Sequence, residues 1–179
     1  MISTLVQAAG RLFLVATAVA GPLALATPAG AAQSVGPSTG LPVPRYVSLK
    51  SDRVNMREGP SRDHQTSWVF QRAGLPVEIT AESDTWRKVR DSEGTEGWVL
   101  KGLLAGKRTA LVAPWRKKEV RPLRSQASDD ASLVANLQTG VLADVKKCDG
   151  RWCRIYGEGF DGFMRQEDLW GVYPGETVD

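Results

Sequence analysis

The sequence contains one pattern twice, and each copy is built on a tryptophan and a glycine-rich loop. Residues 84–99 read DTWRKVRDSEGTEGWV, and residues 150–164 read GRWCRIYGEGFDGFM. Each copy runs from Trp through a β-branched aliphatic residue to a polar loop, and then to Gly, an aromatic and an aliphatic residue. Strand-forming residues thus flank turn-forming residues, which is typical of a β-hairpin.

The repeat extends beyond the two hairpins. Trp86 matches Trp152 at an offset of 66 residues, and Gly74 matches Gly140 at the same offset. Other paired positions drift from this offset by a single residue in either direction, so the sequence predicts two copies of one fold. A domain this small is marginal alone, and five short strands closed into a barrel would bury the aromatic rings without long exposed edges.

No segment shows helical periodicity over a useful length, and residues 77–81 alternate between apolar and polar as a half-buried strand does. The predicted fold class is therefore all-β, with two tandem small barrels. The predicted organisation is a signal peptide (1–32), a disordered Pro/Gly/Ser tether (33–45), a first domain (46–112), a linker (113–118) and a second domain (119–175).

The first 32 residues have the features of a secretory signal. Arg11 precedes an apolar run, and small residues before Ala32 predict cleavage between Ala31 and Ala32. The apolar run is shorter than the roughly 20 residues that a membrane span needs. We therefore expect a protein exported to the periplasm or the extracellular space, with no membrane span after processing.

Two cysteines, Cys148 and Cys153, are the only ones in the chain. In the second hairpin they are cross-strand neighbours, at a separation that suits a disulfide. An exported chain meets an oxidising compartment, which favours a disulfide over a reactive or metal-binding thiol pair.

Several motifs resemble the bacterial SH3 (SH3b) family as a set. They are VNMREGPS (54–61), GLPVEI (74–79) and GTEGWV (94–99) in the first copy, with WCRI (152–155) and LWGVYP (169–174) in the second. The resemblance covers residues 46–175. It implies small five- to six-stranded β-barrels at the cell envelope that bind and have no chemistry of their own. Related modules recognise peptidoglycan or peptides, often beside a hydrolase.

Charge and glycine patterns argue against nucleic-acid and nucleotide ligands. The formal net charge is only +3, and residues 116–118 form the only basic run, so we expect no nucleic-acid partner. Residues 157–162 fit G-x-G-x-x-G, but a strand-forming pair follows where a dinucleotide site needs a helix. This segment is predicted to be a hairpin loop, and no cofactor is expected.

Catalytic groups are equally scarce. His64 is the only histidine, which argues against multi-histidine zinc sites and Cys-His-His peptidases, and it is expected on an exposed loop. The carboxylate pairs 167–168 and 129–130 could be nominated for glycoside hydrolysis, but neighbouring residues on a strand point to opposite faces. We therefore expect no enzymatic activity.

The hairpin tryptophans allow two interpretations. Trp86 lies three residues before Val89, so strict alternation places the two on opposite faces of a strand. A bulge would bring both into the core, and this is the favoured interpretation; otherwise the tryptophan lies on a surface groove. The residues nominated for such a groove are Arg57, Trp68, Trp86 and Trp98, because aromatic walls stack sugars or prolines and an arginine pairs carboxylates.

The function predicted from the sequence is a non-catalytic binding module of the envelope, for peptidoglycan, a cell-wall peptide or an extended protein segment. An adaptor or inhibitor scaffold for another envelope protein is the alternative. A cell-wall hydrolase that uses carboxylates is the least favoured possibility.

Overall fold

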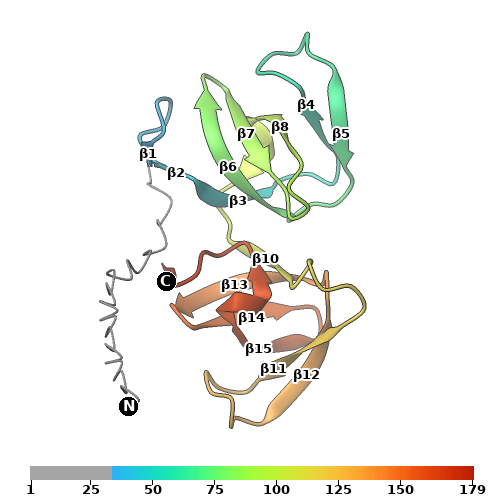
Figure 1. Cartoon of the computed structure of the whole chain (residues 1–179), viewed down its shortest axis with the longest axis vertical. Helices are drawn as coiled ribbons and strands as arrows, with labels where there is room; N and C mark the ends of the chain where they lie inside the picture. Colours follow the sequence, from blue (N-terminus) through green and yellow to red (C-terminus); the bar gives the residue numbers. More distant parts are fainter. Residues whose placement is uncertain (1–33) are drawn as a thin grey trace, which may run out of the picture. The chain divides into compact units, whose positions relative to one another are not determined.

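The computed structural model describes residues 34–179 (Figure 1). The predicted signal peptide and its cleavage point between Ala31 and Ala32 lie outside the described residues. Within residues 34–179, no helix is long and apolar enough to cross a membrane.

The described chain is all-β, as predicted, with two short 3₁₀ turns. The elements are β1 (Ser34–Val35), β2 (Pro42–Val43), β3 (Arg45–Leu49), β4 (Val54–Arg57), β5 (Thr66–Phe70), β6 (Pro76–Ser83), β7 (Trp86–Arg90), β8 (Glu96–Leu100), η1 (Lys101–Leu103), β9 (Leu104–Ala105), β10 (Thr109–Val112), β11 (Val120–Arg124), β12 (Leu133–Gln138), β13 (Leu142–Asp149), β14 (Trp152–Gly157), β15 (Phe160–Arg165), η2 (Gln166–Asp168), β16 (Leu169–Trp170) and β17 (Thr177–Val178).

Apart from the two-stranded β1–β2 hairpin, the strands form two antiparallel sheets with the same topology. The first has the order β5-β4-β8-β7-β6-β3-β9, and the second has the order β12-β11-β15-β14-β13-β10-β16, with β17 added beside β13. Each strand of the second sheet except β17 therefore corresponds to the strand seven places earlier. The predicted duplication of one fold is confirmed.

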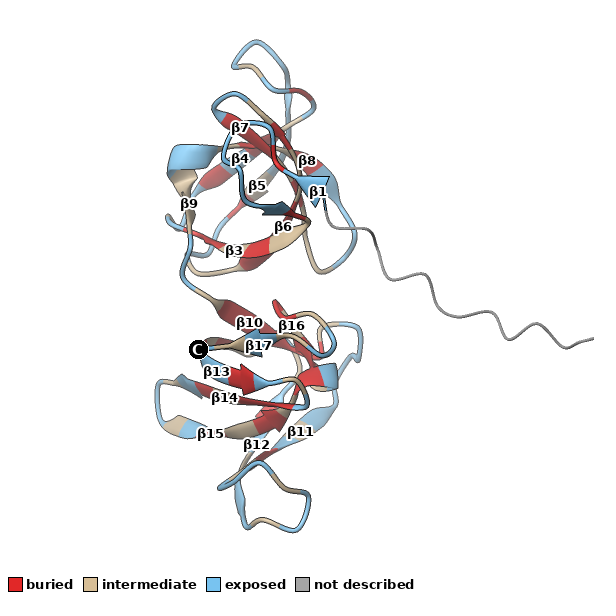
Figure 2. Ribbon diagram, turned by 90° about the vertical axis from the view of Figure 1, so that its left-hand side faces the viewer, coloured by how far each residue is buried: buried red, intermediate tan, exposed pale blue. Residues whose placement is uncertain are grey.

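Each barrel has its own apolar core. In both, the buried residues (red in Figure 2) lie along the strands, while the exposed residues gather on the loops. The first core has members on every strand from β3 to β8, and the second has members on every strand from β10 to β16. The members with the largest fully buried side chains include Met56, Ile79, Leu123, Ile155 and Met164. These are the inward positions of the alternating pattern.

The boundary between the domains differs from the prediction. Thr109–Val112 was expected to close the first domain, but β10 belongs to the second sheet, where Thr109 pairs with Asp144 (Figure 1). Val112 N donates to Val141 O at 3.0 Å, just as Leu49 N donates to Leu75 O at 3.0 Å. β10 is therefore the counterpart of β3 and opens the second barrel.

The linker between the two domains therefore lies at a different position from the one predicted. Residues 113–118, predicted to join the domains, lie in the loop between β10 and β11, and residues 106–108 connect the two sheets instead. The prediction fails here because a short apolar strand has the same sequence pattern whether it ends one barrel or begins the next. The β10–β11 loop is also longer than the β3–β4 loop, which hides the match between β3 and β10.

Residues 34–45, predicted as part of a disordered tether, have a defined structure. β1 and β2 form a hairpin in which Ser34 pairs with Val43. Its turn is held by Glu82, whose carboxylate accepts hydrogen bonds from Ser38 N at 3.0 Å and from Thr39 Oγ1 at 2.7 Å. Local composition does not reveal this order, because the acceptor lies more than forty residues away.

Polar and aromatic contacts join the two barrels within the compact unit of residues 33–179. Tyr173 Oη donates to Glu78 Oε1 at 2.8 Å, and Thr109 Oγ1 donates to Gly74 O at 2.6 Å. The ring of Tyr46 lies 4.7 Å from that of Tyr173, centroid to centroid. Burial raises the pKa of the Tyr173 phenol, and the hydrogen bond to Glu78 raises it further. The phenol therefore stays protonated as a donor.

Candidate ligand-binding groove

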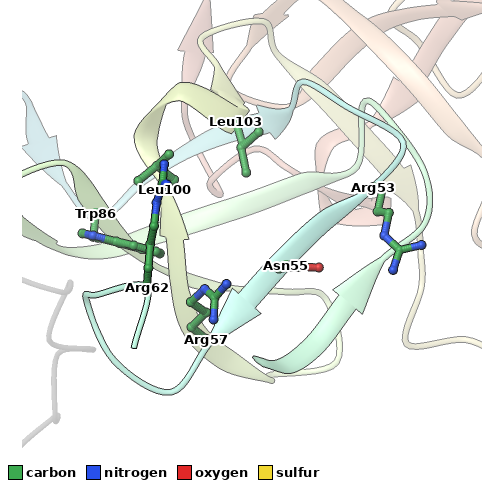
Figure 3. Close-up of a pocket in the computed structure, with 7 residues that line it drawn as sticks. All are labelled: Arg53, Asn55, Arg57, Arg62, Trp86, Leu100 and Leu103. Carbon is green, nitrogen blue, oxygen red and sulfur yellow. The ribbon is translucent and has the colours of Figure 1, made fainter. Parts of the chain in front are cut away.

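A hollow of about 360 Å³ opens on the first barrel between β4, the loop that follows it and the β7–β8 hairpin (Figure 3). Its lining residues are Arg53, Asn55, Arg57, Arg62, Trp86, Leu100 and Leu103. Figure 3 shows Trp86, Leu100 and Arg62 at one end of the hollow and Arg53 at the other. We call this hollow the arginine groove.

The register of β7 explains why Trp86 lines the groove. β7 pairs with β8 without a shift, from Trp86 opposite Leu100 to Val89 opposite Gly97. Val89 belongs to the core cluster, so Trp86 lies on the opposite face of the strand. β7 also pairs with β6, and there the register shifts between Ile79 and Ala81. This shift lies on β6 and does not bring Trp86 to the face of Val89. Trp86 is buried, as the favoured interpretation expects, but it lies outside the core cluster that holds Val89 and also lines the groove.

The inward position that the tryptophan leaves is taken by Arg87, which is 2% exposed. Its guanidinium donates to the carbonyl oxygens of Asp84 at 2.8 Å and Trp86 at 2.6 Å, and its Nε lies 3.4 Å from Glu82. Trp86 itself is only 8% exposed, and it contributes apolar surface to the lining of the groove.

The charge of the groove is entirely positive. Arg57 Nη1 donates to His64 O at 2.7 Å, which holds the loop of residues 58–65 against the groove. Arg53 and Arg62 are exposed. Eight arginines of residues 34–179 form ion pairs with carboxylates, but these three do not. No acidic side chain lines the hollow. The groove therefore presents guanidinium donors that no neighbouring carboxylate occupies.

Of the residues nominated from the sequence, the structure brings together Arg57 and Trp86. Trp68 is 51% exposed on the edge strand β5 and does not line the groove. Trp98 pairs with Arg57 across β4 and β8 and is half-buried, but it also lies outside the lining. The nomination missed Arg53 and Arg62. Arg53 immediately precedes β4, and Arg62 lies in the loop that follows it.

The second barrel repeats the framework of the groove. Its loop of residues 125–132 has the same length as residues 58–65. Arg124 Nη1 donates to Ala131 O at 3.0 Å, as Arg57 does to His64. Trp152 occupies the position of Trp86, with the same 8% exposure.

The second barrel nevertheless fills this space with its own side chains. Asp129 stands where the first barrel has Arg62, and Arg165 stands where it has Leu100. Asp129 and Arg165 form a bidentate ion pair. The Arg165 guanidinium also lies over the Trp152 ring, 5.2 Å from its centroid. The guanidinium and the tryptophan of this copy are thus already partnered.

Comparison with known proteins identifies the two barrels. The family model described as bacterial SH3 domain matches residues 50–106 and again residues 117–171. The chain belongs to the bacterial SH3 domain family. The resemblance inferred from the sequence motifs is therefore confirmed.

Two solved structures are similar to this tandem bacterial SH3 protein at low identity. They are NlpC2 and NlpC1 from Trichomonas vaginalis, each 15% identical with a TM-score of 0.32. The matches cover 72% and 75% of this chain and 48% of each of those chains, so the chain spans about half their length. No curated protein matches the chain.

The cysteines of the second bacterial SH3 domain are paired as predicted. Cys148 lies opposite Cys153 in β13 and β14, and the two form a disulfide. The G-x-G-x-x-G segment is the predicted hairpin loop, since Gly157 at the end of β14 pairs with Phe160 at the start of β15. Both features belong to the framework of the second barrel.

The nominated catalytic groups are dispersed over the surface. His64 is exposed, as expected, and its ring covers Gly59. The carboxylate of Asp168 lies 2.9 Å from Arg121 Nε, and that of Asp129 is held by Arg165. Among the residues that the structure describes, no cluster of three or more His, Cys, Asp or Glu side chains could hold a metal ion.

Proposed function

We propose that this protein is a non-catalytic binding module of the cell envelope, and that the arginine groove of its first barrel binds the carboxylate-bearing peptides of peptidoglycan. Membership of the bacterial SH3 family supports a binding role at the cell wall. The disulfide and the predicted export signal support a place outside the cytoplasm, in the periplasm or beyond it. The observation that carries the proposal is the grouping of Trp86 with three arginines that have no carboxylate partner among the residues that the structure describes.

The chemistry of the groove suits an extended anionic peptide. A guanidinium binds a carboxylate through two parallel hydrogen bonds, which fixes its orientation as well as its charge. Trp86, Leu100 and Leu103 provide apolar surface for aliphatic side chains such as those of alanine. A hollow of about 360 Å³ accommodates a few peptide residues. Peptidoglycan stem peptides combine small apolar side chains with several free carboxylates.

The test is co-sedimentation of the purified protein with peptidoglycan, followed by titration with a soluble stem peptide. Arg53→Gln with Arg62→Gln removes two guanidinium groups and leaves Arg57 to hold its loop. We expect affinity to fall about tenfold or more, because each charge-assisted hydrogen bond contributes roughly 1.5–3 kcal/mol before solvent screening.

The matched control is Arg72→Gln with Arg151→Gln, since both arginines are exposed, form no ion pair within residues 34–179 and lie outside the groove. It should bind like the unmodified protein. A stem peptide with amidated carboxylates should bind as weakly as the groove variant does. Equal binding by the groove variant and the control would refute the proposal.

The adaptor or inhibitor function that the sequence leaves open predicts a different outcome. In that case the protein would remain in the supernatant with peptidoglycan alone. Crosslinking in cells would then recover one dominant envelope protein, whose capture would depend on the arginine groove or on the exposed Trp68.

A further inference from the structure

The loop between β10 and β11 carries residues that have no counterpart in the first barrel. Residues 113–119 form this loop, whereas residues 50–53 are enough to join the corresponding strands β3 and β4. Because the first barrel closes with the shorter connection, the added residues are not needed to complete the fold. Four residues of the longer loop follow one another as Trp115, Arg116, Lys117 and Lys118. We call these four residues the basic tip.

The basic tip projects from the barrel on a defined turn. Six consecutive residues, 115–120, are exposed, and Trp115 is 52% exposed. The base of the loop is anchored, since Ala113 is fully buried and its N–H donates to Asp168 O at 2.8 Å. Arg116 N donates to Ala113 O at 2.9 Å and closes a turn around Trp115. The tryptophan is therefore held in solvent by an ordered backbone.

The backbone of the loop is left-handed at two residues that have a Cβ. Ala113 has a φ of 31° at the start of the loop, and Lys118 has a φ of 61° near its end. This conformation is unfavourable for any residue except glycine, and it is found most often where function constrains the chain. The shape of the basic tip is thus kept at a cost in backbone energy.

The positive charge of the tip is only partly neutralised. Glu119 is the one acidic residue of the loop, and its carboxylate lies 2.9 Å from Arg121 and 3.6 Å from Arg116. Lys117 and Lys118 form no ion pair within residues 34–179. Two unneutralised ammonium groups therefore stand beside an exposed tryptophan.

This combination suits the surface of an anionic lipid bilayer. Tryptophan concentrates at the membrane–water interface because its ring is apolar and its N–H is a donor. Lysines near the bilayer are attracted to anionic lipid headgroups. A protruding tip can enter the headgroup layer, whereas a small molecule needs a concave site. Nucleic acids need a broader basic face with several stacking rings, and this loop offers one tryptophan.

We propose that the basic tip docks the second barrel onto a membrane surface that contains anionic phospholipids. The ring of Trp115 enters the headgroup layer, and the ammonium groups of Lys117 and Lys118 lie against lipid phosphates. The attachment is peripheral, through one loop. It is independent of the peptide function proposed for the arginine groove, because the two sites belong to different barrels and share no residue.

The experiment is co-sedimentation of the purified protein with vesicles of equal parts phosphatidylglycerol and phosphatidylcholine, or of phosphatidylcholine alone. Binding to the anionic vesicles should be at least about tenfold tighter, and it should weaken at high salt, which screens exposed charges. Soluble glycerol phosphate carries the same charged group without a bilayer and should not compete. The tryptophan fluorescence should shift to shorter wavelength as Trp115 enters the headgroup layer.

Lys117→Gln with Lys118→Gln should weaken binding to the anionic vesicles about 25-fold, since each cationic side chain at such a surface contributes about fivefold. The matched control is Lys146→Gln with Lys147→Gln, which also neutralises two adjacent exposed lysines of the second barrel. These lysines likewise form no ion pair within residues 34–179. The control should weaken binding less than about threefold, because its charges lie away from the bilayer.

Trp115→Ala should weaken vesicle binding about tenfold and abolish the fluorescence shift, because the apolar surface that enters the headgroup layer is lost. Trp68→Ala is the matched control, since Trp68 is 51% exposed but lies on β5 of the first barrel. It should keep both the affinity and the shift. Circular dichroism checks that all four variants fold.

Three results would overturn the proposal: no tighter binding to anionic than to neutral vesicles, equal losses in the two lysine variants, or equal losses in the two tryptophan variants. Binding of single-stranded RNA or glycerol phosphate without binding of vesicles would also overturn it. The Lys117/Lys118 variant should still bind peptidoglycan, and the Arg53/Arg62 variant should still bind anionic vesicles. Failure of the groove proposal is therefore distinguishable from failure of this one.

Discussion

The two barrels share a register but differ at one buried cross-strand pair. In the first barrel Glu82 on β6 faces Arg87 on β7, and in the second Cys148 on β13 faces Cys153 on β14. All four residues are at least nine-tenths buried. The same position thus holds an ion pair in one copy and a covalent bond in the other.

The two solutions have different consequences for the chain around them. A buried carboxylate has spare lone pairs and needs several donors, since burying it with one partner costs more than the attraction returns. Glu82 meets this need with Arg45 at 2.7 Å and with two donors of the β1–β2 turn. The disulfide needs no such partners, and Cys148 instead pairs with Val178 of the terminal strand β17. Glu82 therefore attaches the first residues of the described chain to the first barrel, and Cys148 attaches the last residues to the second.

The largest effect is expected from breaking the ion pair. Glu82→Gln leaves the buried Arg87 without a charged partner and weakens the attachment of the β1–β2 hairpin. The free energy of unfolding should fall by about 3 kcal/mol, in the range found when one member of a buried pair is removed. Urea denaturation at neutral pH measures it.

The control is Glu96→Gln, which breaks the ion pair between Lys88 and Glu96, where each side chain is 37% exposed. This substitution should lower the free energy of unfolding by less than about 1 kcal/mol. Equal losses in the two variants would show that the position opposite Arg87 has no special importance.

The carboxyl group of Glu82 should also make the stability of the first barrel depend on pH, which the disulfide of the second barrel does not do. Burial by itself would raise the pKa of this carboxyl, but hydrogen bonds from Thr39, Arg45 and Ser38 outweigh it and lower the pKa from 4.5 to about 2. Because the folded pKa lies below the unfolded one, the stabilisation is present above pH 4.5 and is lost as pH falls toward 2. The stability difference between the protein and Glu82→Gln should shrink across this window, as measured by urea denaturation at several pH values. A constant difference from pH 6 to pH 2.5 would contradict this origin.

A smaller effect is expected from opening the disulfide. Cys148→Ala with Cys153→Ala, or reduction of the unmodified protein, releases a loop with a sequence separation of five residues. Chain entropy predicts a loss of about 2 kcal/mol for a loop this short. Denaturation with and without dithiothreitol measures it, and the Glu82 variant should respond to the reductant equally. A reductant that leaves the unfolding midpoint unchanged would show that the bond contributes nothing.

The duplication and the disulfide were predictable because both depend on local spacing. Cys148 and Cys153 face each other as the geometry of any even hairpin requires, and the tryptophan offset of 66 survives in the register of the strands. The position of β10 was not predictable, because a four-residue apolar strand carries no information about which sheet it joins.

The groove was only half predictable for a related reason. Strict alternation places Trp86 and Val89 on opposite faces of the strand, but the sequence favoured a bulge that brings both inside. The structure shows that the residue on the Val89 face is Arg87. A buried arginine is rare unless it is paired, and its partner Glu82 lies across a strand. The difference between Arg62, which has no ion pair within residues 34–179, and Asp129, which is paired with Arg165, also depends on contacts between strands. Such contacts cannot be read from the residues of one strand alone.

The smallest effect on stability, and the sharpest test of the difference between the barrels, comes from opening the second groove. Asp129→Arg with Arg165→Leu gives the second barrel the residues of the first at both positions. Since Asp129 and Arg165 are 59% and 34% exposed, the change should cost less than about 1 kcal/mol of stability. Trp152 would then be uncovered beside free guanidinium groups, and calorimetry with an acidic stem peptide should show a second binding site.

Asp161→Arg with Arg154→Leu removes a comparable exposed pair away from Trp152 and should leave one site. If the first variant also keeps a single site, the ion pair over Trp152 is not what distinguishes the barrels, and the difference must lie in the loops that carry Arg53 and Arg62.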